Sequence, residues 1–154
     1  MCFSLQNAKS ETPPIVITML GDSLTAGYGL PIGEGLTDQL QTALNEKTDK
    51  KINIRIINAG VSGDTTAGGL ARFDWSIPSE TDALIIALGG NDALRGLSPD
   101  AMAENLDTIL GTVQRDGLPL LFAGMKAPGN MGADFGRDFD KAFADALKKA
   151  KLRA

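Results

Sequence analysis

The chain has 154 residues, 43% of them apolar, and a net charge of −4 at pH 7, which suits one domain with its own core. No basic stripe indicates a nucleic-acid partner, and no apolar run is long enough for stable membrane insertion. The single cysteine excludes an internal disulfide. The absence of histidine removes the usual general base and the commonest metal ligand, so we expect neither a metal nor a cofactor.

From residue 15 onward the sequence predicts alternating strands and helices. Residues 1–14 are polar and end in two prolines, which is typical of a flexible N-terminal arm. Apolar, β-branched runs predict strands at 15–20, 52–57, 82–88 and 118–123, and periodic apolar positions or caps predict helices at 36–44, 65–73, 99–116 and 135–147. This order predicts a single α/β domain at 15–154, with a parallel sheet covered by helices on both faces.

Three of the predicted strands end in clusters of glycine and polar residues. The clusters are GDS at 21–23, GDT at 63–65 and GGND at 89–92. The carboxyl ends of parallel strands share one edge of the sheet, and open α/β sheets bind ligands at that edge. We therefore expect the three clusters to converge on one small site.

The first cluster supplies a candidate nucleophile, Ser23, at the start of a helix whose free N–H groups face the site. Attack of its hydroxyl on an ester creates an oxyanion that needs preorganised donors. The candidate donors are the Ser23 N–H, the Gly63 N–H and the Asn91 carboxamide. Plainer alternatives remain open, because Ser23 could be a helix N-cap and Asn91 a turn residue bonded to its own backbone.

Taken together, three motifs resemble the SGNH, or GDSL-motif, hydrolase family, in particular its bacterial arylesterase, acyl-thioesterase and lysophospholipase type. They are GDSLTAGYG at 21–29, NAGVSGDTTAGGLARF at 58–73 and LGGNDALRGLSP at 88–99. The resemblance implies a flavodoxin-like three-layer α/β/α sandwich and a serine ester hydrolase that acts on a small acyl ester or thioester. It implies Ser23 as the catalytic nucleophile and Ser23, Gly63 and Asn91 as the oxyanion hole. It also implies a periplasmic or secreted protein if a signal peptide was removed, and a cytoplasmic one otherwise.

The family also takes its catalytic acid and base from a C-terminal Asp-x-x-His block, which follows one more strand and precedes one more helix. Nothing in this chain matches that block. We therefore expect a C-terminally incomplete domain whose final strand and helix are missing, through truncation, a frameshift or the choice of a fragment, unless another residue serves as base.

Without the histidine and aspartate of the triad, we expect impaired activity. The alternative function is a non-catalytic acyl-binding or assembly module of the same fold. A nucleotide-binding domain is disfavoured, because the first strand is followed neither by G-x-G-x-x-G nor by a P-loop lysine.

An incomplete sheet should expose one edge beside the strand at 118–123, and an open edge is a template for another chain. We therefore expect a homo-oligomer formed through this edge. The last predicted helix has an apolar face at Phe135, Phe139, Phe143 and Leu147. This face could pack against a partner or fold back over the gap.

Overall fold

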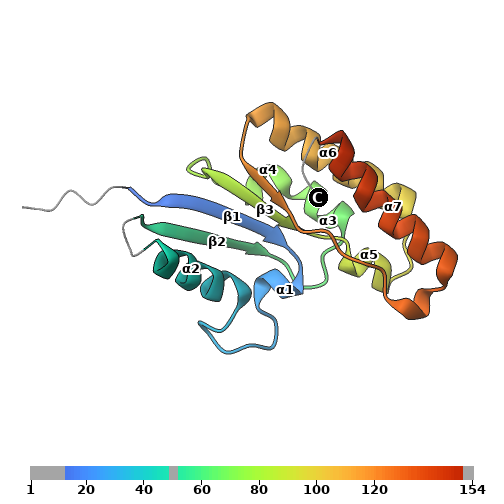
Figure 1. Cartoon of the computed structure of the whole chain (residues 1–154), viewed down its shortest axis with the longest axis horizontal. Coiled ribbons are helices and arrows are strands. Elements are labelled where there is room, and N and C mark those ends of the chain that lie inside the picture. The colour runs from blue at the N-terminus through green and yellow to red at the C-terminus, as the bar shows by residue number, and fades with distance from the viewer. Residues whose placement is uncertain (1–12, 49–51, 151–154) are drawn as a thin grey trace, which may run out of the picture.

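The computed structural model describes residues 13–48 and 52–150 (Figure 1). The predicted arm lies outside the described residues except for Pro13 and Pro14. The strands are β1 (Ile15–Gly21), β2 (Ile54–Gly60), β3 (Ala83–Ala87) and β4 (Leu120–Phe122). The helices are α1 (Ser23–Ala26), α2 (Leu36–Lys47), α3 (Thr66–Ala71), α4 (Phe73–Ser76), α5 (Gly90–Leu94), α6 (Pro99–Asp116) and α7 (Ala133–Lys149), with a 3₁₀ turn, η1 (Gly129–Met131).

All pairings in the described sheet are parallel, in the strand order β2-β1-β3-β4. This is the flavodoxin-like order, in which the strand order reverses beside β1. Gly21 at the end of β1 lies level with Gly60 of β2 and Ala87 of β3. The loops that follow these three strands therefore leave the sheet side by side.

Helices cover the two faces of the sheet, as predicted (Figure 1). On one face, Leu40 of α2 packs against Met19 and Ile85. On the other face, Leu20 and Ile86 belong to a larger buried cluster with side chains of α6 and α7. The largest fully buried helical side chains of that cluster are Met102, Leu106, Ile109, Leu110, Val113 and Phe139. The α/β sandwich predicted from the sequence is thus confirmed.

Helix α6 begins and ends where its sequence signals predict. The Ser98 hydroxyl accepts a hydrogen bond from the Ala101 N–H, and Pro99 is the first helical residue. Gly117 ends the helix at a φ of +69°, a left-handed conformation that glycine adopts without a steric penalty.

The aromatic stripe of α7 faces the core of the same chain. Phe139 and Phe143 are buried, and Phe135 and Leu147 pack against the same cluster while partly exposed. The structure shows α7 packed against α6 of its own chain rather than across the edge of β4. The expectation that it folds back over that gap is therefore wrong, and its packing against a partner stays a prediction.

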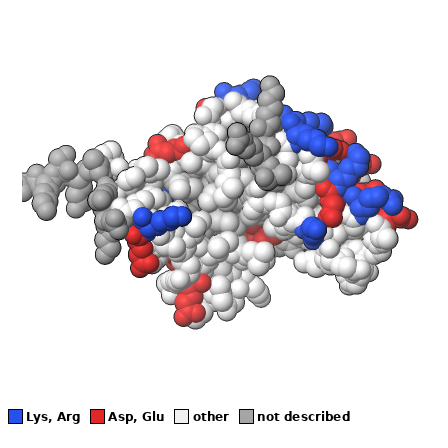
Figure 2. Space-filling view, in the orientation of Figure 1, with Lys and Arg blue, Asp and Glu red and all other residues white. Residues whose placement is uncertain are grey.

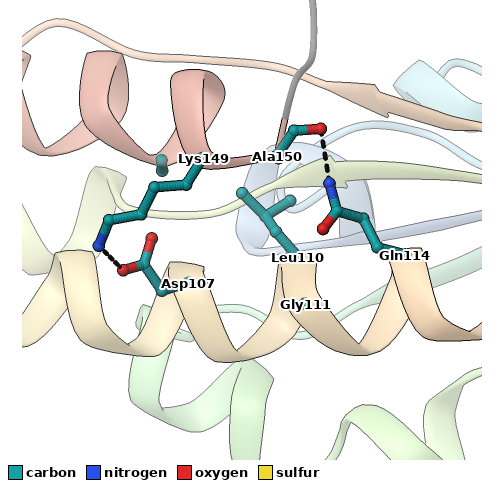
Figure 3. Close-up of a pocket in the computed structure, with 7 residues that line it drawn as sticks. Asp107, Leu110, Gly111, Gln114, Lys149 and Ala150 are labelled. Atoms are coloured by element: carbon teal, nitrogen blue, oxygen red, sulfur yellow. Dashed lines mark hydrogen bonds and ion pairs between the residues drawn. The ribbon is translucent and has the colours of Figure 1, made fainter.

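The far end of α7 is fastened to α6 (Figure 3). Gln114 Nε2 donates a 2.6 Å hydrogen bond to the Ala150 carbonyl oxygen, and Lys149 forms an ion pair with Asp107. A cavity of about 130 Å³ lies between the helices at this point. The polar side chains that line it are those of Asp107, Gln114 and Lys149, which already make these helix-end contacts.

Several predicted boundaries differ from the structure for local reasons. The strand at 52–57 begins later, at Ile54, and β4 has three residues, partly because Pro119 has no N–H to donate to a sheet. The single helix predicted at 65–73 breaks at Arg72 into α3 and α4. Helix α1 begins at Ser23, where the sequence analysis expects a helix. Helix α5 was not predicted, because five residues are too few to show a helical period.

Candidate active site

The turn after β1 holds Ser23 at the start of α1. Asp22, not Ser23, is the N-cap: its carboxylate accepts a 3.0 Å hydrogen bond from the Leu24 N–H. The N-cap reading of Ser23 is therefore wrong. Gly21 has to be a glycine, because a Cβ there would lie 2.0 Å from the Thr25 hydroxyl oxygen.

The Ser23 side chain is half-buried. Among the described residues, neither its hydroxyl nor its N–H forms a hydrogen bond. Ser23 thus has a free hydroxyl and a free donor at the carboxyl end of the sheet, the position expected for a nucleophile that also stabilises an oxyanion.

The loop after β2 places Gly63 beside this turn. The Val61 N–H donates a 3.0 Å hydrogen bond to the Gly21 carbonyl, which ties the loop to the end of β1. Gly63 has a φ of +82°, and its carbonyl oxygen accepts a 2.6 Å hydrogen bond from Arg95 Nη2. The Gly63 N–H has no acceptor in the described part of the chain. A hydrogen bond therefore fixes the Gly63 carbonyl, while the Gly63 N–H is available to donate to a ligand.

Asn91 of α5 contacts both of the other clusters. Its Nδ2 donates to the Asp64 carbonyl at 2.9 Å and to Asp22 Oδ2 at 3.4 Å. Both partners are far away along the sequence, so the reading of Asn91 as a turn residue bonded to its own backbone is wrong. The structure brings together the three clusters that contain Ser23, Gly63 and Asn91.

Sequence reasoning missed a buried arginine that links two of the clusters. Arg72 is only 6% exposed. Its Nε donates to Asp64 Oδ2 at 2.6 Å and its Nη2 to the Gly21 carbonyl at 3.0 Å, while Nη1 donates to the Ser76 hydroxyl at 3.0 Å. The only signal was one arginine between Leu70 and Phe73 in an otherwise apolar helix segment. Buried charges of this kind are normally paired.

A second missed bridge joins α5 to α3. The buried Asp92 accepts hydrogen bonds from the Thr66 hydroxyl at 2.6 Å and the Thr66 N–H at 2.9 Å. Asn105 Nδ2 donates to the same hydroxyl at 3.1 Å. These bonds account for the Asp92 carboxylate as a structural anchor of α5, the short helix that carries Asn91.

The described residues contain no group of three or more histidine, cysteine, aspartate or glutamate side chains that could hold a metal ion. None of the helices in the described segments combines the length and apolarity needed to cross a bilayer. The pKa of Asp145 is lowered by a hydrogen bond from Lys141, whose own pKa is raised. Both residues are on α7, and neither of them hydrogen-bonds to the site residues named above.

A flavodoxin-like parallel sheet with three polar loops at its carboxyl edge defines an α/β protein with a ligand site at that edge. The profile of the GDSL-like Lipase/Acylhydrolase family matches residues 19–154. The chain therefore belongs to this family, whose members include the SGNH carboxylic ester hydrolases, and the predicted resemblance is confirmed.

Similar proteins carry esterase names. The chain is 32% identical to "Esterase TesA" of Pseudomonas aeruginosa over 97% of this chain and 74% of that protein. It is 33% identical to "Arylesterase" of Vibrio mimicus over 96% of this chain and 69% of that protein. The crystal structure of AlinE4, "a SGNH-hydrolase family esterase", superposes with a TM-score of 0.86 at 47% identity, covering 94% of this chain and 76% of that one.

Proposed function

We propose that this chain acts on carboxylic esters or thioesters through an acyl-serine intermediate at Ser23. The Ser23 N–H, the Gly63 N–H and Asn91 Nδ2 form the oxyanion hole. The observation that carries the proposal is the position of Asn91, whose amide contacts the Asp22–Ser23 turn and the Gly63–Asp64 loop at once. The esterase names of the relatives support the same class of substrate.

In the proposed reaction, Ser23 Oγ forms a bond to the acyl carbon while its proton passes to water or a soluble base, which returns a proton to the departing alcohol or thiol. The carbonyl oxygen becomes an oxyanion that accepts hydrogen bonds from the three donors. Expulsion of the alcohol or thiol leaves an acyl-serine, which water then hydrolyses. An incoming oxyanion would replace the longer Asn91 contact, the one to Asp22 at 3.4 Å.

We also propose that the 154-residue chain hydrolyses esters and thioesters slowly. The chain contains no histidine, and no described side chain hydrogen-bonds to Ser23 Oγ to take its proton. An oxyanion hole and substrate binding without a complete triad can still accelerate the reaction by about 10³ to 10⁴ over water. The absence of histidine also favours the second candidate, an acyl-binding module that binds the acyl group without turnover.

The test measures hydrolysis of an aryl ester by the 154-residue chain with and without imidazole as an external base. We expect a slow rate that imidazole raises and that Ser23→Ala reduces to the background of free imidazole. Mass spectrometry should detect the acyl group on the peptide that contains Ser23. Asn91→Ala should lower acylation by about 100- to 1000-fold, the usual effect of losing one oxyanion donor.

The outcomes separate the candidates. Ester binding without acylation of Ser23, even with imidazole, would indicate an acyl-binding module. Fast turnover without imidazole that disappears in Ser23→Ala would support the nucleophile and refute the proposed impairment, because another group would then serve as base.

A further inference from the structure

The two edges of the described sheet differ in how their backbone groups are satisfied. On the outer edge of β2, Asn45 accepts a hydrogen bond from the Ile54 N–H at 2.8 Å and donates one to the Ile54 carbonyl at 2.9 Å. Gln41 accepts another from the Ile56 N–H at 2.7 Å. Two amide side chains of α2 thus bond to three outward backbone groups where a neighbouring strand would otherwise pair, and they protect the first part of this edge.

The outer edge of β4 has no such protection within residues 13–48 and 52–150. The Leu84 N–H donates to the Pro119 carbonyl, and the Ala123 N–H donates to the Ile86 carbonyl. Since inward-facing groups alternate along a parallel ladder, the N–H and C=O groups of Leu120 and Phe122 point away from the sheet. None of these four groups has a hydrogen-bond partner among the described residues.

Apolar surface adjoins this open edge on the α2 face of the sheet. A hollow of about 350 Å³ is lined by Ile17, Leu40, Leu44, Ala83, Leu84, Ile85, Pro119, Leu120 and Leu121. Leu121, at its rim, is 62% exposed. Segment 118–127 crosses the front of the view in Figure 1, and in Figure 2 the middle of the same view carries few charged side chains. A second copy would meet little charge repulsion here, despite the net charge of −4.

We propose that a second copy of this chain binds at this edge, with the two β4 strands antiparallel across a two-fold axis. Leu120 of each copy then lies opposite Phe122 of the other, so that all four outward backbone groups of each strand are paired. The two Leu121 side chains face each other across the axis. Asn45 and Gln41 already bond to the β2 edge at Ile54 and Ile56, which disfavours pairing there. A two-fold assembly through the β4 edge alone closes as a dimer rather than growing into a fibre.

The oligomeric state is measured by light scattering over a dilution series, which does not depend on the proposed chemistry. We expect a dimer at high micromolar concentration that dissociates on dilution. Leu121→Lys should raise its dissociation constant by at least about tenfold, because like charges directly opposite one another destabilise cross-strand pairs. Leu94→Lys is the matched control: Leu94 is 71% exposed and lies outside β4 and the apolar hollow, so that this variant should associate like the parent.

Cross-linking tests the register. In a Cys2→Ser background, Leu121→Cys places two cysteines in a non-hydrogen-bonded pair with their Cβ atoms about 4.5–5.5 Å apart, close enough for an intermolecular disulfide after small adjustments. Leu94→Cys should not cross-link under the same oxidation. A monomeric mass at high micromolar concentration, a dimer unaffected by Leu121→Lys, or a dimer that fails to cross-link through position 121 would each overturn the proposal.

Discussion

Replacing Arg72 by methionine tests whether the buried arginine holds two loops of the candidate site together. Methionine keeps an unbranched apolar stem and removes the guanidinium. The side chains of Arg72 and Asp64 are only 8% and 12% exposed, and their closest atoms lie 2.6 Å apart. Removing one partner leaves the other charge buried without compensation, which typically destabilises a protein by about 3–5 kcal/mol.

The structure shows which group loses its partner when the Arg72 guanidinium is removed. The Gly21 carbonyl still accepts from the Val61 N–H after Arg72 is removed, so the penalty concentrates on the Asp64 carboxylate. Asp64→Asn should therefore relieve part of it. In a double-mutant cycle, we expect a coupling free energy of about 0.5–3 kcal/mol between Arg72 and Asp64, the range for residues in one hydrogen-bond network. Arg72→Lys should be intermediate, because one ammonium group cannot reproduce the arginine fork.

The assay is urea unfolding followed by circular dichroism, with the slope of the transition checked for constancy. Arg55→Met is the matched control, because Arg55 pairs with Glu80 at 3.5 Å with about half of each side chain exposed. Exposed pairs contribute about 0–1 kcal/mol. If Arg72→Met destabilised the chain no more than Arg55→Met, the bridge would not hold the loops and this reasoning would be refuted.

Three further outcomes are expected. Gly63→Ala should destabilise the chain by about 1–2 kcal/mol in urea unfolding, because alanine is strained at the left-handed φ of +82°. Acylation of Ser23, measured by mass spectrometry on the folded variant, should also be slower than in the parent. Asn45→Ala leaves the Ile54 N–H and carbonyl unpaired, which should cost about 1–3 kcal/mol and should produce species larger than dimers in light scattering. Phe139→Ala, at a side chain 1% exposed, should lower the free energy of unfolding by about 3–5 kcal/mol, and an unchanged urea midpoint would contradict its place in the core.

Local signals in the sequence were sufficient for most of the fold. Helix α6 carries its own boundaries in Ser98, Pro99 and Gly117, and the spacing of the α7 aromatics predicted the face that is buried. The alternation of strands and helices fixed a parallel sheet, which in turn brought the three glycine-polar clusters to one edge. Each of these steps depends on residues close together in the sequence.

The polar bridges could not be predicted in the same way. Arg72 hydrogen-bonds to the Gly21 carbonyl across 51 positions of the sequence, and Asp92 hydrogen-bonds to Thr66 across 26 positions. The amides that protect β2 lie on α2, where Asn45 and Gln41 look like ordinary polar positions of an amphipathic helix. Such contacts depend on the height and rotation of each element, which periodicity leaves undetermined.

The position of Asn91 shows how the core determines the site. Gly89, just before α5, has a φ of +117°, and a Cβ there would lie 2.8 Å from the Phe143 ring. The backbone that leads to Asn91 therefore rests directly on an aromatic side chain of α7, which explains why glycine is needed at this point. The Phe143 ring in turn packs at a tilt against Phe122 of β4 and edge-to-face against Phe139, with ring centroids 5.5 and 5.2 Å apart. Although none of the site contacts described above comes from a polar group of α7, the packing of this helix sets the height at which the Asn91 amide meets the Ser23 and Gly63 loops.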